Sequence, residues 1–171
     1  VCSRIGEYER SSRLYQALLE EYPQNAKVWL SYAHVLKMEG KREACEAAYR
    51  GAIDRDERFG EAYWSLANLK TFRFSEQDIT NMQRQVARED LELSSRVQFY
   101  FALGKAAEDA GDYSVSFDHY DKGNALHRST LNYQHAQNNR RVNRMKTQFT
   151  ESFFRQRAGM GCPDDSPIFI V

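Results

Sequence analysis

The residues that could do chemistry are few and scattered. The four histidines are His34, His119, His127 and His135, and the last three are spaced by eight residues. On a helix, each step of eight residues turns the side chain by about 80°, which separates the three imidazoles too far for one metal ion to bind them. The sequence therefore predicts no metal site.

The three cysteines, Cys2, Cys45 and Cys162, are an odd number and contain no C-x-x-C pair. Cys45 falls where a packed helix requires a small side chain, which predicts an inert core thiol rather than a nucleophile. Free thiols favour a reducing, cytoplasmic compartment. No serine elbow organises a catalytic set, and we interpret the acidic pairs as solvated. We therefore expect no catalytic and no cofactor-binding residue, so that the chain itself is not an enzyme.

Charge and hydropathy narrow the partners. Lysine plus arginine equals aspartate plus glutamate at 24 each, so no overall field attracts nucleic acid or an acidic membrane. No apolar run approaches the roughly 18 residues that a membrane helix needs. The expected partner is a protein or peptide segment, with neither nucleic acid nor membrane.

Glycines mark an internal repeat. Gly6 and Gly40 are 34 residues apart, and Gly111 follows 71 residues later, close to two further periods. Apolar residues at helical spacing flank each glycine, which predicts pairs of amphipathic helices joined by tight turns. Over residues 3–130 this pattern resembles the tetratricopeptide repeat. The resemblance implies an all-α, tetratricopeptide-like superhelix of helical hairpins, with C-terminal capping helices and a short terminal extended segment.

Two repeats depart from the pattern. The first lacks its first helix, which leaves the second, residues 7–21, short of cover, and we expect self-association into a homo-oligomer there. Its apolar residues are Tyr8, Leu14, Tyr15, Leu18 and Leu19. The third repeat has no glycine turn after Ala67. Instead, Ser75 is a predicted helix N-cap, followed by a stripe of Ile79, Met82 and Val86, and Ser94–Ser95 is a second start signal.

The composition changes after residue 125. From His127 to Phe149 there are five basic residues and no acid, with a broken apolar stripe. We expect one long helix here, either straight or kinked, capping the array, then a shorter helix over residues 150–157 that ends at Gly159 and Gly161. The basic side chains of the long helix, Arg140, Arg141 and Arg144, are candidates for docking on a downstream domain or an anionic substrate.

The chain ends on a different kind of segment. Residues 162–167 have the composition of a linker, and residues 167–171, Pro-Ile-Phe-Ile-Val, are typical of a buried strand. We therefore divide the chain into repeats at 1–130, capping helices at 131–161, and a linker with the first strand of an absent domain at 162–171.

Four segments carry a narrower resemblance: residues 63–71, 101–113, 123–126 and 167–171. They are similar to bacterial proteins that join tetratricopeptide repeats to a sulfotransferase domain. The resemblance implies a parent enzyme that uses 3′-phosphoadenosine-5′-phosphosulfate. The family's phosphosulfate loop and catalytic residues have no counterpart in this chain. Three alternatives follow: an interaction module beside a sulfotransferase, a part of that enzyme, or a free-standing scaffold.

In such arrays the first helices line a concave face. Mixed polar and aromatic groups there suit a peptide or an extended acidic segment. The residues expected on this face by helical position are Leu30, His34, Lys37, Trp64, Asn68, Thr71, Phe101, Lys105 and Glu108.

Overall fold

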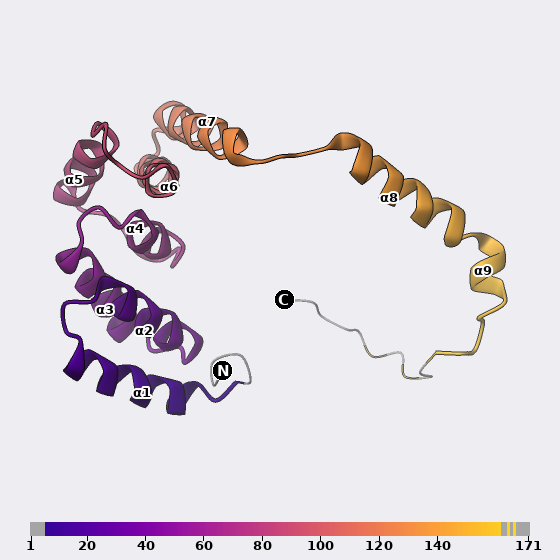
Figure 1. Ribbon diagram of the computed structural model, residues 1–171, viewed down its shortest axis with the longest axis horizontal. Coiled ribbons are helices and arrows are strands. Elements are labelled where there is room, and N and C mark those ends of the chain that lie inside the picture. The colour runs from indigo at the N-terminus through magenta and orange to yellow at the C-terminus, as the bar shows by residue number, and fades with distance from the viewer. Residues whose placement is uncertain (1–5, 162–163, 165, 167–171) are drawn as a thin grey trace. The chain divides into compact units, whose positions relative to one another are not determined.

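The computed structural model describes residues 6–161, 164 and 166, and these form helices and no strand. The helices are α1 (Tyr8–Glu21), α2 (Ala26–Met38), α3 (Arg42–Arg55), α4 (Gly60–Ala67), α5 (Glu76–Val86), α6 (Leu93–Asp109), α7 (Tyr113–Thr130), α8 (His135–Gln148) and α9 (Glu151–Arg155). The chain divides into two compact units, Val1–Thr130 and Leu131–Val171 (Figure 1). The predicted all-α fold of helical hairpins is confirmed.

Two glycine turns close hairpins in the same way. Gly40 and Gly111 have φ of +73° and +80°, a left-handed conformation that glycine adopts without a Cβ clash. After α2, the Lys41 N–H donates to the Leu36 carbonyl at 3.0 Å, and after α6 the Asp112 N–H donates to the Ala107 carbonyl at 3.0 Å. These bonds satisfy carbonyls at the helix ends. They join α2 to α3 and α6 to α7.

Small residues bring the helices together, and aromatic residues fill the core between them. Ala33, Ala52, Ala62 and Ala102 are fully buried, and so are the rings of Tyr49, Tyr63 and Phe99. The centroids of Tyr63 and Phe99, from α4 and α6, lie 5.0 Å apart. Cys45 lies in this core, as predicted, and burial raises the pKa of its thiol.

The third repeat, which contains α4 and α5, is not a helical hairpin. Its first helix, α4, has eight residues, and it packs on α3 and α6, while α5 packs on α6. The turn after α4 passes through Lys70, whose φ of 60° is the one positive value among the described residues that are not glycine. As predicted, Ser75 caps α5, and Asp78 completes a capping box with it.

A partly buried ion pair joins this unit to the preceding hairpin. The Arg50 guanidinium on α3 donates to both carboxylate oxygens of Asp78, with Nη2 2.8 Å from Oδ2. The Ser75 N–H and hydroxyl donate to the same carboxylate at 2.9 and 2.8 Å. Burial raises the pKa of Asp78, but the bonds from Arg50 and Ser75 outweigh it, and the net pKa is below the usual value.

The prediction of one helix over 127–149 is wrong. Helix α7 ends at Thr130, and α8 begins only at His135. The hydroxyls of Ser129 and Thr130 donate to the carbonyls of Leu126 and His127 at 2.6 and 2.7 Å, which satisfies two acceptors that a continuing helix would use. The shorter helix expected next is α9, capped by Thr150, and Gly159 follows it with φ of +79°.

Helix α6 begins at Leu93 after the N-cap Glu92, so the start signal at Ser94–Ser95 was placed slightly late. On α1, Leu14 and Leu18 are exposed while the other three apolar residues are half-buried, and self-association there stays a prediction. The strand expected at 167–171 lies outside the described residues, as do Cys2 and Cys162. None of the described helices is both long and apolar enough to cross a membrane.

Lys70 gives a prediction about stability. Because glycine adopts a positive φ without a Cβ clash, Lys70→Gly should raise the free energy of unfolding by about 0.5–1 kcal/mol. Urea unfolding followed by circular dichroism measures the change. The matched control is Gly40→Lys, since a Cβ at Gly40 meets nothing within 4 Å and only the conformational cost remains. It should lose a similar amount. A Lys70→Gly chain that is no more stable than the wild type would contradict this.

Asp78 gives a prediction about pH. Its folded pKa is depressed, so its contribution to stability is present above the unfolded pKa and is lost as pH falls through the folded value. At neutral pH, Asp78→Asn should cost about 2 kcal/mol because Arg50 loses a charged, hydrogen-bonded partner. The difference between wild type and variant should shrink below about pH 4, where unfolded aspartate protonates. A difference that is constant from pH 7 to pH 3 in urea titrations would refute the assignment.

Candidate functional site

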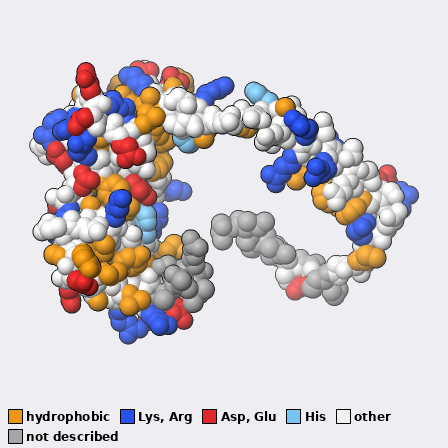
Figure 2. Space-filling view, viewed as in Figure 1, with side chains coloured by type: hydrophobic (Ala, Val, Ile, Leu, Met, Phe, Trp, Pro, Cys, Tyr) orange, Lys and Arg blue, Asp and Glu red, His pale blue; other side chains and the backbone are white. Residues whose placement is uncertain are grey.

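The first unit carries an open hollow where α4, α6 and the end of α7 meet. Its volume is about 490 Å³. The residues that line it, which we call the aromatic groove, are Trp64, Leu93, Ser94, Val97, Gln98, Phe101, His127 and Thr130. In the space-filling view, hydrophobic side chains reach the surface over this part of the unit among charged ones (Figure 2). Two of the expected concave-face residues, Trp64 and Phe101, therefore meet in one site.

Two aromatic rings form the apolar centre of the groove. The centroids of Trp64 on α4 and Phe101 on α6 lie 5.4 Å apart in a tilted arrangement, and both side chains are half-buried. Tilted and edge-to-face ring pairs at this distance are favourable. The fold thus leaves a large apolar surface partly open to solvent where α4 and α6, from neighbouring repeats, meet.

Two glycines allow α7, which forms one side of the groove, to pack closely on α6. An added Cβ at Gly123 on α7 would lie 2.9 Å from the ring of Phe101, and one at Gly104 would lie 2.8 Å from the ring of Tyr120. Both distances are too short for a real side chain. Because α7 packs this closely on α6 and runs to its end at Thr130, its last turns deliver His127 and Thr130 to the groove.

Polar side chains border the apolar centre. Ser94, Gln98, Thr130 and His127 offer hydroxyl, amide and imidazole groups, which can donate to or accept from a peptide backbone. A neighbouring hollow of about 620 Å³ shares Ser94 and Gln98 and is lined by several charged residues, among them Lys27, Glu61 and Glu92. The groove therefore has an apolar centre with hydrogen-bonding groups around it and a charged neighbour.

His34 and Lys37 lie on α2, outside the groove. The His34 Nε2 is 3.4 Å from the Ser65 hydroxyl, and its ring meets Tyr49 edge-on with centroids 5.6 Å apart. Burial lowers the pKa of His34, Glu61 raises it and Lys37 lowers it again, with a net downward shift. Leu30, expected on the same face, is buried in the core, so that expectation is wrong.

Asn68 and Thr71 were placed on the first helix of the third unit, and this is wrong. Helix α4 ends at Ala67, so Asn68 is its C-cap and Thr71 lies in the loop beyond. The Thr71 hydroxyl donates to the Leu69 carbonyl at 3.1 Å. Both residues are exposed, but neither lines the groove.

Lys105 and Glu108 are held in a polar cluster at the end of α6. Lys105 pairs with Asp109, and its Nζ lies 3.9 Å from Glu108. The Tyr120 hydroxyl donates to Glu108 at 3.0 Å, and burial together with this bond raises the pKa of Tyr120 to about 12. Arg73 pairs with Asp109 at 3.1 Å. These charges already have partners within the fold and lie outside the groove.

The groove contains residues that were not expected in it. Val97 precedes Phe101 by one helical turn and could have been found from that spacing. His127 and Thr130 could not, because they were assigned to a capping helix rather than to the last turns of α7. Gln98 and Leu93 gave no signal in the sequence.

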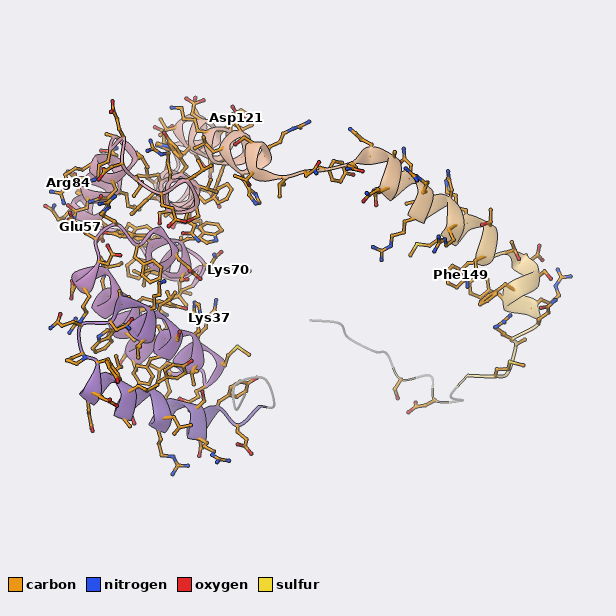
Figure 3. The ribbon with its side chains drawn as sticks, viewed as in Figure 1. Lys37, Glu57, Lys70, Arg84, Asp121 and Phe149 are labelled. Carbon is orange, nitrogen blue, oxygen red and sulfur yellow. The ribbon has the colours of Figure 1, made fainter. Side chains whose placement is uncertain are left out.

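The second unit presents the basic helix α8. Its three arginines, Arg140, Arg141 and Arg144, line a hollow of about 370 Å³ with Gln137, and all are exposed. Val142, Met145 and Phe149 follow at helical spacing and are 40%, 44% and 48% exposed. Helix α8 thus exposes an apolar stripe beside its charges, and Phe149 is labelled in Figure 3.

Within the described ranges, no group of three or more histidine, cysteine, aspartate or glutamate side chains is placed to hold a metal ion. A scan of protein-family models finds no match to the chain, and a search of curated proteins finds none either. Function is therefore inferred from the geometry of the groove and of α8.

Proposed function

We propose that the chain is a protein-interaction module that binds an extended peptide segment in the aromatic groove. The observation that carries this proposal is the contact of Trp64 and Phe101, half-buried and 5.4 Å apart, at the centre of an open hollow. A few central side chains, tryptophan often among them, supply most of the binding energy at protein interfaces once the partner excludes water from them. The polar border then hydrogen-bonds the backbone of the segment and fixes its direction.

The groove suits a segment with one large apolar side chain. Inserting such a side chain between Trp64 and Phe101 removes apolar area from water on both partners, at about 25 cal/mol per Å². Arrays of helical hairpins provide rigid surfaces of this kind, because each unit contacts only its neighbours and presents the same face. We propose on the same grounds that the hairpins are tetratricopeptide repeats.

The groove predicts which substitutions abolish binding. The full chain is used to select peptides from a displayed random library, and the affinity of a selected peptide is measured by fluorescence anisotropy. Phe101→Ala should weaken binding about tenfold or more, the usual effect of removing a central aromatic anchor. Thr130→Trp should have a similar effect by filling the groove from an exposed position.

The matched control is Phe117→Ala, which removes an aromatic ring that is 70% exposed on α7 and does not line the groove. Its affinity should equal that of the wild type, and circular dichroism should show that all three variants are folded. Selected peptides that bind Phe101→Ala and Thr130→Trp as tightly as the wild type would sink the proposal.

A second surface is favoured by a separate observation. We propose that α8 docks on an acidic surface of a neighbouring domain, because exposed apolar residues accompany its arginines. A merely solvated helix face has no need of that stripe. The expected downstream sulfotransferase domain and its use of 3′-phosphoadenosine-5′-phosphosulfate remain predictions. So does the alternative of a free-standing scaffold, and the gene sequence beyond Val171 decides between them.

The docking role of α8 predicts a salt-dependent interaction. Changing Arg140, Arg141 and Arg144 to glutamine should weaken binding to the separately produced neighbouring domain several-fold at low salt. The difference should fade as salt rises, because ions screen exposed charges beyond about 10 Å at 0.1 M. A matched triple change to glutamine at Arg13, Lys27 and Lys122 should leave affinity unchanged. An α8 variant with wild-type affinity at every salt concentration would rule the docking role out.

A further inference from the structure

Two lysines project from the side of the array on which α2, α4 and α6 lie. Lys37 is in the last turn of α2, and Lys70 follows the end of α4. Figure 3 shows both side chains pointing from the same side of the first unit, opposite to the side that carries Glu57 and Arg84. Lys37 is exposed, and Lys70 is exposed as well.

Three acids on the neighbouring helices and turns are paired with other cations. Glu39 lies 3.0 Å from Lys41, Glu46 accepts from Arg42 at 2.9 Å, and Asp109 is shared by Arg73 and Lys105. Among the described residues, no ion pair or side-chain hydrogen bond is formed by the ammonium group of Lys37 or of Lys70. This edge of the array therefore presents two positive charges that the described fold leaves available.

The backbone conformation at Lys70 is unusual for a lysine. The turns after α2 and α6 use Gly40 and Gly111 for the left-handed residue, whereas the turn after α4 uses a lysine with φ of 60°. A lysine is strained there and glycine is not. The backbone conformation of this turn therefore does not require a lysine side chain.

The opposite edge of the same side carries charges of both signs. At the N-terminal ends of α4 and α6, Glu61 and Glu92 line the neighbouring hollow that borders the aromatic groove, together with Lys27 and Arg58. A segment anchored in the groove therefore meets mixed charges towards the helix N-termini and lysines towards the C-termini. The lysines attract an acidic segment towards the C-terminal edge.

We propose that Lys37 and Lys70 bind carboxylates of the segment whose apolar anchor occupies the aromatic groove, so that the ligand is an acidic peptide. This inference rests on the proposed function. Packed helices are about 8–10 Å apart, and an extended peptide rises about 3.3 Å per residue. Carboxylates about three residues apart on the peptide therefore span neighbouring helices such as α2 and α4, and so match the two lysines.

The test compares two sets of variants with two peptides. Peptides selected by the wild-type chain should carry two aspartate or glutamate residues about three positions apart, beside a large apolar residue. In Lys37→Gln with Lys70→Gly, affinity for such a peptide should fall about tenfold and lose most of its salt dependence, as expected for two exposed charge pairs. The same peptide with glutamine in place of its acids should bind wild type and variant equally. Arg13→Gln with Lys122→Gln, which removes the same charge at exposed positions that line neither hollow, should bind like the wild type.

The outcomes separate the two proposals. Because Lys70→Gly relieves strain, a loss of affinity in this variant reflects the missing charge and not a weakened fold. Peptides that need Phe101 but carry no acids, or that bind the double lysine variant at wild-type affinity, would overturn the acidic-ligand inference and leave the groove intact. If peptides bind without needing Phe101, the proposed function fails first and this inference fails with it.

Discussion

The close contact between α4 and α6 is the constraint on which the groove depends. A Cβ at Gly60 would lie 2.4 Å from the carbonyl oxygen of Ser95, a distance that no side chain can occupy. The backbones of the two helices therefore meet at this point. One turn later on α4, Trp64 reaches the ring of Phe101 on α6. Any larger residue at position 60 would force the helices apart and separate the rings, so the aromatic pair exists because a glycine precedes it.

The third repeat, which contains α4 and α5, is held in place without a helical hairpin. Helices α4 and α5 are joined by a loop, and the core is continued by Phe72 and Phe74, whose rings meet edge-on 5.1 Å apart. The Arg50 guanidinium lies 5.1 Å from the centroid of Phe72 and also binds Asp78. One cation thus links α3 to the loop and to α5. A partly buried pair of this kind contributes little net stability compared with apolar packing, but it specifies which surfaces meet. This role fits a unit whose helices lack the usual turn between them.

The sequence predicted the local signals better than the contacts across helices. Gly40 and Ser75 act through their own backbone or their nearest neighbours, so position and residue type are enough to assign them. The early end of α4 at Ala67 and the end of α7 at Thr130 depend on competition between weak alternatives, and apolar spacing alone did not reveal them. Predicting the groove required knowing that α7 ends at Thr130, because His127 reaches the groove only if α7 is long and close to α6. Trp64 and Phe101 were found because each lies at a regular helical position.

The short α4 has a consequence for electrostatics as well as for packing. Carbonyls at the C-terminus of a helix carry partial negative charge, which attracts cations to the last turn. Lys37 could satisfy that attraction within α2 alone, and its place there has a local explanation. Lys70, just beyond the end of α4, is subject to the same attraction, but the backbone at its position costs energy that glycine would not cost. The two lysines therefore differ in what a lysine costs at their positions. Lys37 becomes informative only because Lys70, on the same side of the next unit, extends its charge along the array, and a ligand that contacts both units is what would use the pair.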